Sequence, residues 1–175
     1  KEMMYYSGFP QMLARRGIST IMVDHGGTGE ALRLRNIKAR VDTEAFISPI
    51  IDWVENQPEL AADKVGVVGW SLGGYYAPRT AAFEKRVKLA VAWGANHNWA
   101  EVQQGRRNRE GENPVPHYWE HVFWVWGVDN IDDFMEVTKD MHLNGVVEEI
   151  TVPFLITHGA NDRQINVKYA QQSYD

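Results

Sequence analysis

The pentapeptide Gly69-Trp70-Ser71-Leu72-Gly73 stands between a short β-branched run, 65–68, and a stretch with helical spacing that begins at Tyr75. The run before it has the composition of a buried parallel strand, and the apolar residues after it recur in a helix-compatible register. A serine in such a turn from strand to helix is lifted above the edge of the sheet, in the arrangement known as a nucleophile elbow. The pattern predicts Ser71 as a catalytic nucleophile, with glycine needed at 69 and 73 because side chains there would collide with the tight turn.

A glycine-rich turn that cradles a phosphate at a helix N-terminus is the alternative interpretation of this segment. The chain lacks both the Gly-x-Gly-x-x-Gly dinucleotide pattern and a Gly-Lys-Ser/Thr ending. The elbow is therefore the better supported of the two interpretations.

The composition indicates one globular domain and argues against two classes of partner. The chain has 175 residues, of which 44% are hydrophobic and 23% charged, enough for one domain and too few for two full ones. A net charge of -5 argues against nucleic acid or an anionic membrane as the main partner. No apolar run reaches the length of a membrane span, no signal peptide pattern is visible and cysteine is absent, so we expect a cytoplasmic protein without disulfides or thiolate metal sites. The sequence leaves open whether the protein forms a homodimer.

The remaining pattern alternates expected strands with expected helices. Strands are expected over 18–23, 65–68, 87–93 and 154–157. A first helix is expected to end near Arg16, and a second is expected to begin near Asp42 or Thr43. A third should follow Ser71. Pro78 should kink its helix, and Pro49 should bend its helix or delay the start. This alternation predicts an α/β fold with a mostly parallel sheet and helices on both faces.

A tryptophan-rich block, with an aromatic helix expected over 117–126, interrupts this alternation. It divides the chain into a first core segment (1–94), a helical insertion (95–147) and a second core segment (148–175). The tryptophans at or inside the block are Trp93, Trp99, Trp119, Trp124 and Trp126. They fill a core, or they form an aromatic cap that closes over Ser71 and binds a flat or apolar substrate. On the second interpretation, the candidate substrate contacts are Trp70, Trp93, His97 and Trp124. A solvated surface is expected for the arginines Arg106, Arg107 and Arg109.

Several further patterns accompany the elbow in order along the chain: Lys1-Glu2, Arg16-Gly17, Asp24-x-x-Gly27-x-Gly29-Glu30, Ala92-Trp93-Gly94 and His158-Gly159-x-x-Asp162. With them, the chain resembles the α/β-hydrolase fold. More narrowly, it is similar to the branch that groups prolyl-oligopeptidase-like esterases with 2,6-dihydroxypseudooxynicotine hydrolases and fungal polyketide-shortening hydrolases. The resemblance implies no cofactor.

The resemblance also implies roles for individual residues. Ser71 is the nucleophile, Asp162 is the acid that orients the catalytic histidine, and the backbone N–H of Leu72 is one donor of the oxyanion hole. Asp162 could instead cap the loop that follows its strand. His158 is expected to be a hydrogen-bonded structural residue and not the base.

The chain departs from the family pattern at both ends. The fold places the catalytic histidine after one further strand and helix, yet 163–175 contains no histidine. The first strands and the second oxyanion donor would precede Lys1, and one of those strands would lie between the strand ending at Asp24 and the elbow strand. We therefore expect an internal segment of a longer hydrolase, with a gap in its sheet and a histidine roughly 25 to 45 residues beyond Asp175.

The predicted function is that of a serine hydrolase that forms an acyl-enzyme on a small apolar or aromatic substrate. The bond cleaved is an ester, an amide or a carbon–carbon bond next to a ketone. A hydrolase-fold receptor or an inactive homologue is the alternative. A zinc peptidase using His117, Glu120 and His121 is a remote one, since His-x-x-Glu-His is the pattern of inverted zinc peptidases. A metal pair at Asp24 and His25 is equally remote.

Overall fold

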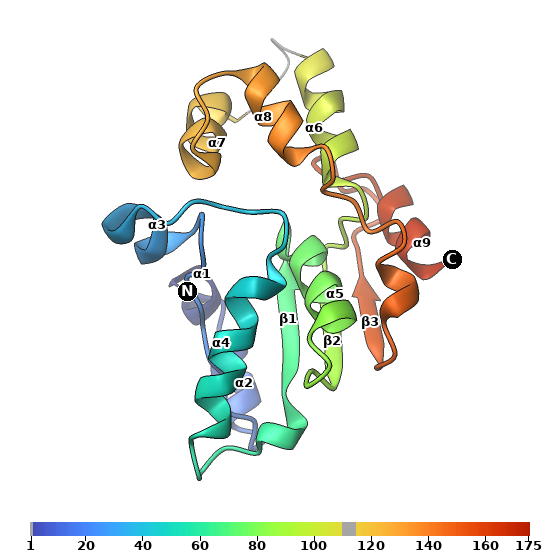
Figure 1. Cartoon of the computed structure of the whole chain (residues 1–175). Helices are drawn as coiled ribbons and strands as arrows, with labels where there is room; N and C mark the ends of the chain where they lie inside the picture. The colour runs from blue at the N-terminus through green and yellow to red at the C-terminus, as the bar shows by residue number, and fades with distance from the viewer. Residues whose placement is uncertain (1, 110–114) are drawn as a thin grey trace.

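Three parallel strands form the sheet of the computed structural model, which describes residues 2–109 and 115–175. The strands are β1 (Gly66–Trp70), β2 (Leu89–Trp93) and β3 (Phe154–Thr157), in the order β1-β2-β3. Trp70 pairs with Trp93 and Trp93 with Thr157, so the three carboxyl ends meet at one edge (Figure 1). In open parallel sheets, ligand sites form at this edge.

One face of the sheet is covered by helices. Small side chains at Ala90 and Ala92 of β2 let α5 (Gly73–Phe83) and α9 (Lys168–Tyr174) pack on this face, and α4 (Glu44–Glu55) packs against α5. The predicted start near Thr43 is confirmed, because Thr43 precedes the first residue of α4. Pro49 lies inside α4 and so does not delay its start.

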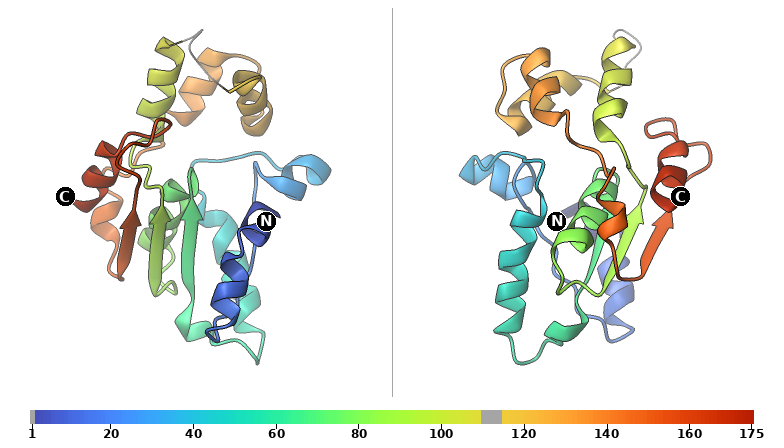
Figure 2. Two further views of the ribbon diagram at one scale, coloured as in Figure 1. Left: turned by 180° about the vertical axis from the view of Figure 1, so that it is seen from behind. Right: turned by 45° about the vertical axis from the view of Figure 1, so that its right-hand side comes forward.

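The opposite face carries much less cover. Its large apolar side chains are exposed, between 39% and 53% of their maximum, at Val68, Trp70, Leu89, Trp93 and Leu155. The helix α2 (Phe9–Ala14), which follows α1 (Glu2–Tyr6), lies on this side of the sheet (Figure 2, left). Its Phe9 ring contacts the Trp93 ring, with the centroids 5.7 Å apart. Helices therefore lie on both faces of the described sheet, but unevenly.

The strand predicted over 18–23 is wrong. Residues 18–25 are neither helix nor strand, and the one backbone hydrogen bond described for 18–23 joins the Ile18 N–H to Leu13 O. Ile18 and Ile21 are about half exposed, at 51% and 45%. A strand exists through its pairing, and β-branched residues alone do not make one where no described neighbour takes their hydrogen bonds.

A helix that the sequence patterns did not predict follows this segment. The Asp24 carboxylate accepts a hydrogen bond from the Glu30 N–H at 3.1 Å in the first turn of α3 (Gly29–Arg35). A side chain at Gly29 would overlap that carboxylate, and Gly29 has a φ of +43°. The Asp24-x-x-Gly-x-Gly29-Glu30 pattern is therefore the start of a capped helix.

Three helices within residues 95–147 form a layer over the carboxyl edge of the sheet (Figure 1). They are α6 (Trp99–Asn108), α7 (Tyr118–Trp126) and α8 (Ile131–Thr138). The two ends of the block 95–147 meet, because Asn98 bridges His142 and the Leu143 N–H donates to His97 O at 2.8 Å. Short 3-10 turns at Ala62–Lys64 (η1) and Val147–Glu149 (η2) precede β1 and β3.

The layer packs around Phe134, which is fully buried, in a core that also includes Tyr75 and Ala82 of α5. The rings in contact with Phe134 belong to Trp99, Trp119, Phe123 and Trp126. Trp99 and Trp126, at 6% and 8% exposure, are thus core residues, whereas Trp124 is 42% exposed. No helix among the described residues is long and apolar enough to cross a membrane.

A polar network fastens α4 to the turn after α5, and it predicts an acid-sensitive contribution to stability. Arg86 binds Glu84 through two side-chain hydrogen bonds at 2.8 and 2.7 Å and reaches Asp52 at 2.6 Å. These bonds to Arg86 hold the pKa of Glu84 at about 2, far below its ordinary value. Because the folded-state pKa is lowered, the contribution is present above the unfolded-state pKa and is lost as the pH falls toward 2.

We expect Glu84→Gln to lower the free energy of unfolding by about 2–3 kcal/mol at pH 7, because a buried charge partner of Arg86 is removed. The difference from the wild type should shrink as the pH falls from 5 to 2, as measured by urea unfolding. Glu136→Gln removes an exposed ion pair with Lys139 and should cost under about 1 kcal/mol. Equal losses of unfolding free energy in Glu84→Gln and Glu136→Gln would contradict the stabilising role assigned to the bonds between Glu84 and Arg86.

Candidate active site

Ser71 occupies the turn between β1 and α5, where the sequence predicts the elbow. Its φ is +59°, a left-handed conformation that few non-glycine residues adopt. The Ser71 N–H donates to Trp93 O at 2.9 Å and the Ser71 carbonyl accepts from the Gly74 N–H at 2.7 Å, so both neighbouring elements hold the turn. The residue is exposed, and no hydrogen bond joins its hydroxyl to another described residue. Strained backbone under an exposed hydroxyl is typical of a functional site.

The glycines around Ser71 are not equally constrained. A Cβ at Gly69 would overlap the carbonyl oxygen of Gly73, and a Cβ at Gly74 would overlap that of Gly94. A Cβ at Gly73 would meet nothing within 4 Å. The predicted collision therefore holds at Gly69 and is wrong at Gly73. The second close approach is at Gly74, one residue beyond the pentapeptide, where α5 passes over the end of β2.

This difference gives a stability prediction within one motif. We expect Gly69→Ala to lower the free energy of unfolding by about 3 kcal/mol or more, because the new methyl group would meet rigid backbone. Gly73→Ala has free space at the first position of α5 and should change stability by less than about 1 kcal/mol. Chemical denaturation of the two variants measures the contrast, and a tolerated alanine at 69 would show that the turn relaxes.

The Leu72 backbone N–H, the expected oxyanion donor, is not consumed by the fold. Leu72 precedes the first residue of α5, and its N–H donates to no acceptor among the described residues. Free N–H groups at the start of a helix favour negative charge. Such a group beside Ser71 is suited to an oxyanion.

Asp162 lies in the loop after β3, and its two carboxylate oxygens are used differently. Oδ1 accepts hydrogen bonds from the N–H groups of Gln164 at 2.7 Å and Ile165 at 3.0 Å. Oδ2 lies 3.8 Å from His158 Nε2, too far for a hydrogen bond, and the side chain is 33% exposed. Loop capping thus occupies one oxygen and leaves the other open.

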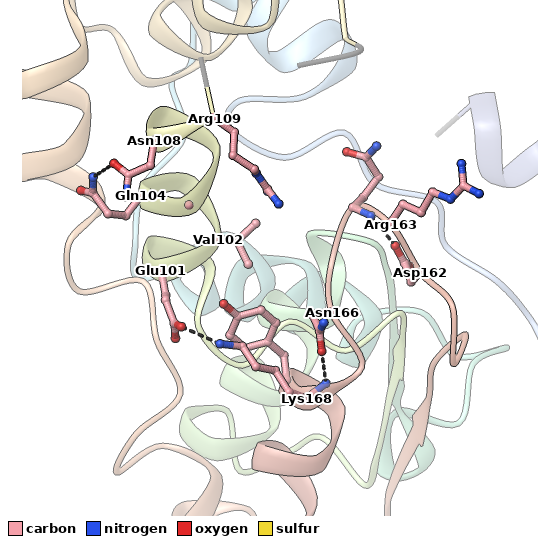
Figure 3. Close-up of a pocket in the computed structure, with 12 residues that line it drawn as sticks. Glu101, Val102, Gln104, Asn108, Arg109, Asp162, Arg163, Asn166 and Lys168 are labelled. Carbon is pink, nitrogen blue, oxygen red and sulfur yellow. Dashed lines mark hydrogen bonds and ion pairs between the residues drawn. The ribbon is translucent and has the colours of Figure 1, made fainter. Parts of the chain in front are cut away.

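A cavity of about 560 Å³ lies beside Asp162, between α6 and residues 162–169 (Figure 3). Its wall on the α6 side includes Glu101 and Val102, and Glu101 is paired with Lys168 across the cavity at 2.6 Å. Arg106 of α6 also reaches the loop, donating to Gln164 Oε1 at 2.9 Å. The surface position expected for Arg106 is thus partly wrong, because its guanidinium also covers the Tyr118 ring at 4.1 Å.

His158 is a hydrogen-bonded residue at the end of β3, as the sequence predicts. Its Nε2 donates to the Ile165 carbonyl at 2.8 Å, and its side chain is 2% exposed. No histidine among the described residues is hydrogen-bonded to the Ser71 hydroxyl.

Two of the four candidate substrate contacts come together. The indole rings of Trp70 and Trp93 stack with their centroids 5.5 Å apart and an interplanar angle of 21°. They are 41% and 39% exposed and sit at the carboxyl ends of β1 and β2, next in sequence to Ser71 and Gly94. The pair forms an apolar surface beside the elbow, on the face opposite α5.

The other two candidates lie apart from this pair. His97 is 5% exposed, and its ring nitrogens contact Ser173 Oγ at 3.2 Å and Asn144 Oδ1 at 2.9 Å. It therefore has no free polar atom for a ligand. Trp124 of α7 faces the loop before α4, where Lys38 donates to its carbonyl at 2.7 Å and lies 5.6 Å from its ring. No described ring contact joins Trp124 to the stacked pair.

The metal alternatives gain no support from the geometry. His117 and Glu120 are 79% and 80% exposed and bind each other at 3.0 Å. At the other candidate position, burial lowers the pKa of His25, and its Nδ1 contacts the Gly26 carbonyl at 2.8 Å. The described residues contain no group of three or more side chains that could hold a metal ion.

The chain matches a known protein family over nearly its whole length. The prolyl oligopeptidase family matches residues 4–175. The chain belongs to this family. The assignment confirms the resemblance drawn from the elbow and from the His158-Gly159-x-x-Asp162 pattern.

Among curated relatives, the chain is 28% identical over 191 residues to "Hydrolase acrC" of Aspergillus aculeatus, covering 92% of this chain and 44% of that protein. It is also 28% identical over 148 residues to "2,6-dihydropseudooxynicotine hydrolase" of Paenarthrobacter nicotinovorans, covering 84% of this chain and 37% of that protein. This member of the prolyl oligopeptidase family thus spans less than half the length of either relative.

A solved structure shares the fold. The crystal structure of the 2,6-dihydroxy-pseudo-oxynicotine hydrolase matches with a TM-score of 0.70 and 24% identity, covering 86% of this chain and 40% of that one. The predicted α/β-hydrolase fold is therefore confirmed.

Proposed function

We propose that this chain belongs to a serine hydrolase that forms an acyl-enzyme, with Ser71 as the nucleophile. The observation that carries the proposal is the left-handed backbone of Ser71, with φ +59°, under an exposed hydroxyl at the carboxyl edge of the sheet. A fold that needed only a turn here would place glycine, which adopts this conformation without strain. Serine in its place supplies a hydroxyl at the cost of strain.

The reaction follows from the groups around Ser71. Its oxygen attacks the substrate carbonyl while a histidine takes the hydroxyl proton, and the Leu72 N–H stabilises the oxyanion. The same histidine returns the proton to the leaving group, and water then hydrolyses the acyl-enzyme by the reverse sequence. We propose that this histidine comes from residues outside the described chain and binds Oδ2 of Asp162. The open oxygen and the cavity beside it support that placement.

We propose a small apolar or aromatic substrate. The stacked Trp70 and Trp93 rings beside Ser71 support an aromatic contact, and we place residues 95–147 as a cap over the edge of the sheet. The buried His97 is left out of the proposed contacts, and Trp124 would belong to the cap. The bond cleaved is an ester, an amide or a carbon–carbon bond next to a ketone, and the last of these requires a leaving group that stabilises a carbanion.

Labelling with a serine-directed fluorophosphonate tests the proposal. In the longer protein that contains this chain, mass spectrometry should locate the label on Ser71, because only an activated serine reacts at a useful rate. Ser19, an exposed serine after α2 with no hydrogen bond described for its side chain, serves as the control, and Ser19→Ala should label like the wild type. An unlabelled protein that still binds small aromatic molecules would favour the receptor alternative. Turnover that is sensitive to a chelator and survives Ser71→Ala would favour the zinc alternative.

A further inference from the structure

We infer that His158 is a positioning residue that fixes the direction of the Asp162 carboxylate. The inference rests on the proposed function, in which Asp162 orients the catalytic imidazole. Its observations come from the loop after β3 and do not involve Ser71.

Ile165 is the residue through which the two side chains are joined. Its carbonyl accepts the His158 Nε2–H at 2.8 Å, and its N–H donates to Asp162 Oδ1 at 3.0 Å. One peptide segment is therefore held from both sides, by the end of β3 and by the acid itself. The Ile165 side chain is 8% exposed and packs with Val102 of α6 and Tyr169 of α9. These contacts fix the position of Ile165 and so of the loop around it.

The hydrogen-bonding state of His158 follows from its partners. A carbonyl only accepts, so Nε2 carries the proton. Nδ1 is buried without a partner among the described residues, and the side chain is 2% exposed. Burying an imidazole with one unsatisfied nitrogen costs free energy that an apolar side chain would not. The bond to Ile165 is the one hydrogen bond described for this imidazole, and it offsets part of the cost.

His158 holds Asp162 without occupying it. The 3.8 Å separation between His158 Nε2 and Asp162 Oδ2 is longer than a hydrogen bond, so Oδ2 stays open for a second imidazole. With Oδ1 fixed by two backbone N–H groups, the direction of Oδ2 depends on where the loop sits. The orientation of a histidine bound to Oδ2 would therefore depend on the position of this loop.

Two amide substitutions separate this role from simple packing. In His158→Gln, the amide donor has nearly the reach of the imidazole Nε2, whereas in His158→Asn the side chain is one bond too short to reach the Ile165 carbonyl. In the longer protein, we expect His158→Asn to lower kcat roughly 10- to 100-fold with little change in KM, because a misdirected acid impairs chemistry more than binding. His158→Gln should recover kcat to within a few-fold of the wild type.

The kcat values are compared per folded molecule, after circular dichroism has established the folded fraction. A kcat for His158→Asn within threefold of the wild type, or equal losses in the two amide variants, would overturn the inference. A second measurement, which needs no variant, determines the tautomer of His158. A long-range ¹H–¹⁵N spectrum of the wild type should show the proton on Nε2. A proton on Nδ1 alone would overturn the inference. Fluorophosphonate labelling of wild-type Ser71 is the reference, because its absence would count against the serine mechanism and not against the loop geometry.

Discussion

Replacing Ser71 by alanine should lower kcat/KM of the longer hydrolase by roughly 10⁴- to 10⁶-fold. The variant loses the oxygen that forms the acyl-enzyme, and a water molecule at the same place lacks the positioning that the elbow supplies. The fold should persist, because the exposed Ser71 hydroxyl makes no hydrogen bond with the described residues. Turnover with chromogenic esters and unfolding by denaturant measure the two effects separately.

The matched control is Ser19→Ala, which removes an exposed hydroxyl after α2 with no described hydrogen bond and should leave kcat/KM unchanged. A loss of stability in Ser71→Ala is not expected, since alanine at a positive φ meets strain similar to that of serine. Residual turnover above about 1% of the wild type would show that another group carries the reaction.

Replacing Asp162 by asparagine should lower kcat roughly 10⁴-fold, through the direction that the loop imposes on the amide. The N–H groups of Gln164 and Ile165 need an acceptor, so the asparagine oxygen should take the place of Oδ1. Its NH₂ group then faces the position of Oδ2. A donor at that position would hold the imidazole in the wrong tautomer, in which the nitrogen facing Ser71 carries a proton and cannot take the one from the hydroxyl.

Single-turnover kinetics measure this effect, since acylation itself should slow while substrate binding persists. Asp63→Asn, an exposed change in the short turn before β1, is the control and should behave like the wild type. A kcat for Asp162→Asn within tenfold of the wild type would restrict Asp162 to capping its loop.

The elements that were predicted correctly are those whose signal lies within a few neighbouring residues. The strand over 154–157, the helix that begins after Thr43 and the aromatic helix ending at Trp126 all follow from local periodicity and end signals. The strand over 18–23 failed although its residues favour a strand, because pairing depends on a partner elsewhere in the chain.

The site shows the same division between local and distant information. The position of Ser71 follows from its own pentapeptide, but the need for glycine at 74 arises from Gly94, twenty residues away in sequence. The motif predicted a collision at Gly73 that does not occur, because the free space around a residue depends on the packed structure. The role of Ile165 carried no sequence signal, because it acts through its backbone. Its nearness to the His158-x-x-x-Asp162 pattern was the one available hint.

The meeting of residues 98 and 142 at a single bridge has an evolutionary meaning. Chain that leaves and re-enters a domain at neighbouring points can lengthen, shorten or be exchanged while the domain keeps its own path. In the proposed cap, the helices α6, α7 and α8 could then vary with few changes outside the places where they pack against α5. With residues 95–147 as the proposed cap, the substrate preference could change by remodelling this one segment, while the turn that carries Ser71 stays the same.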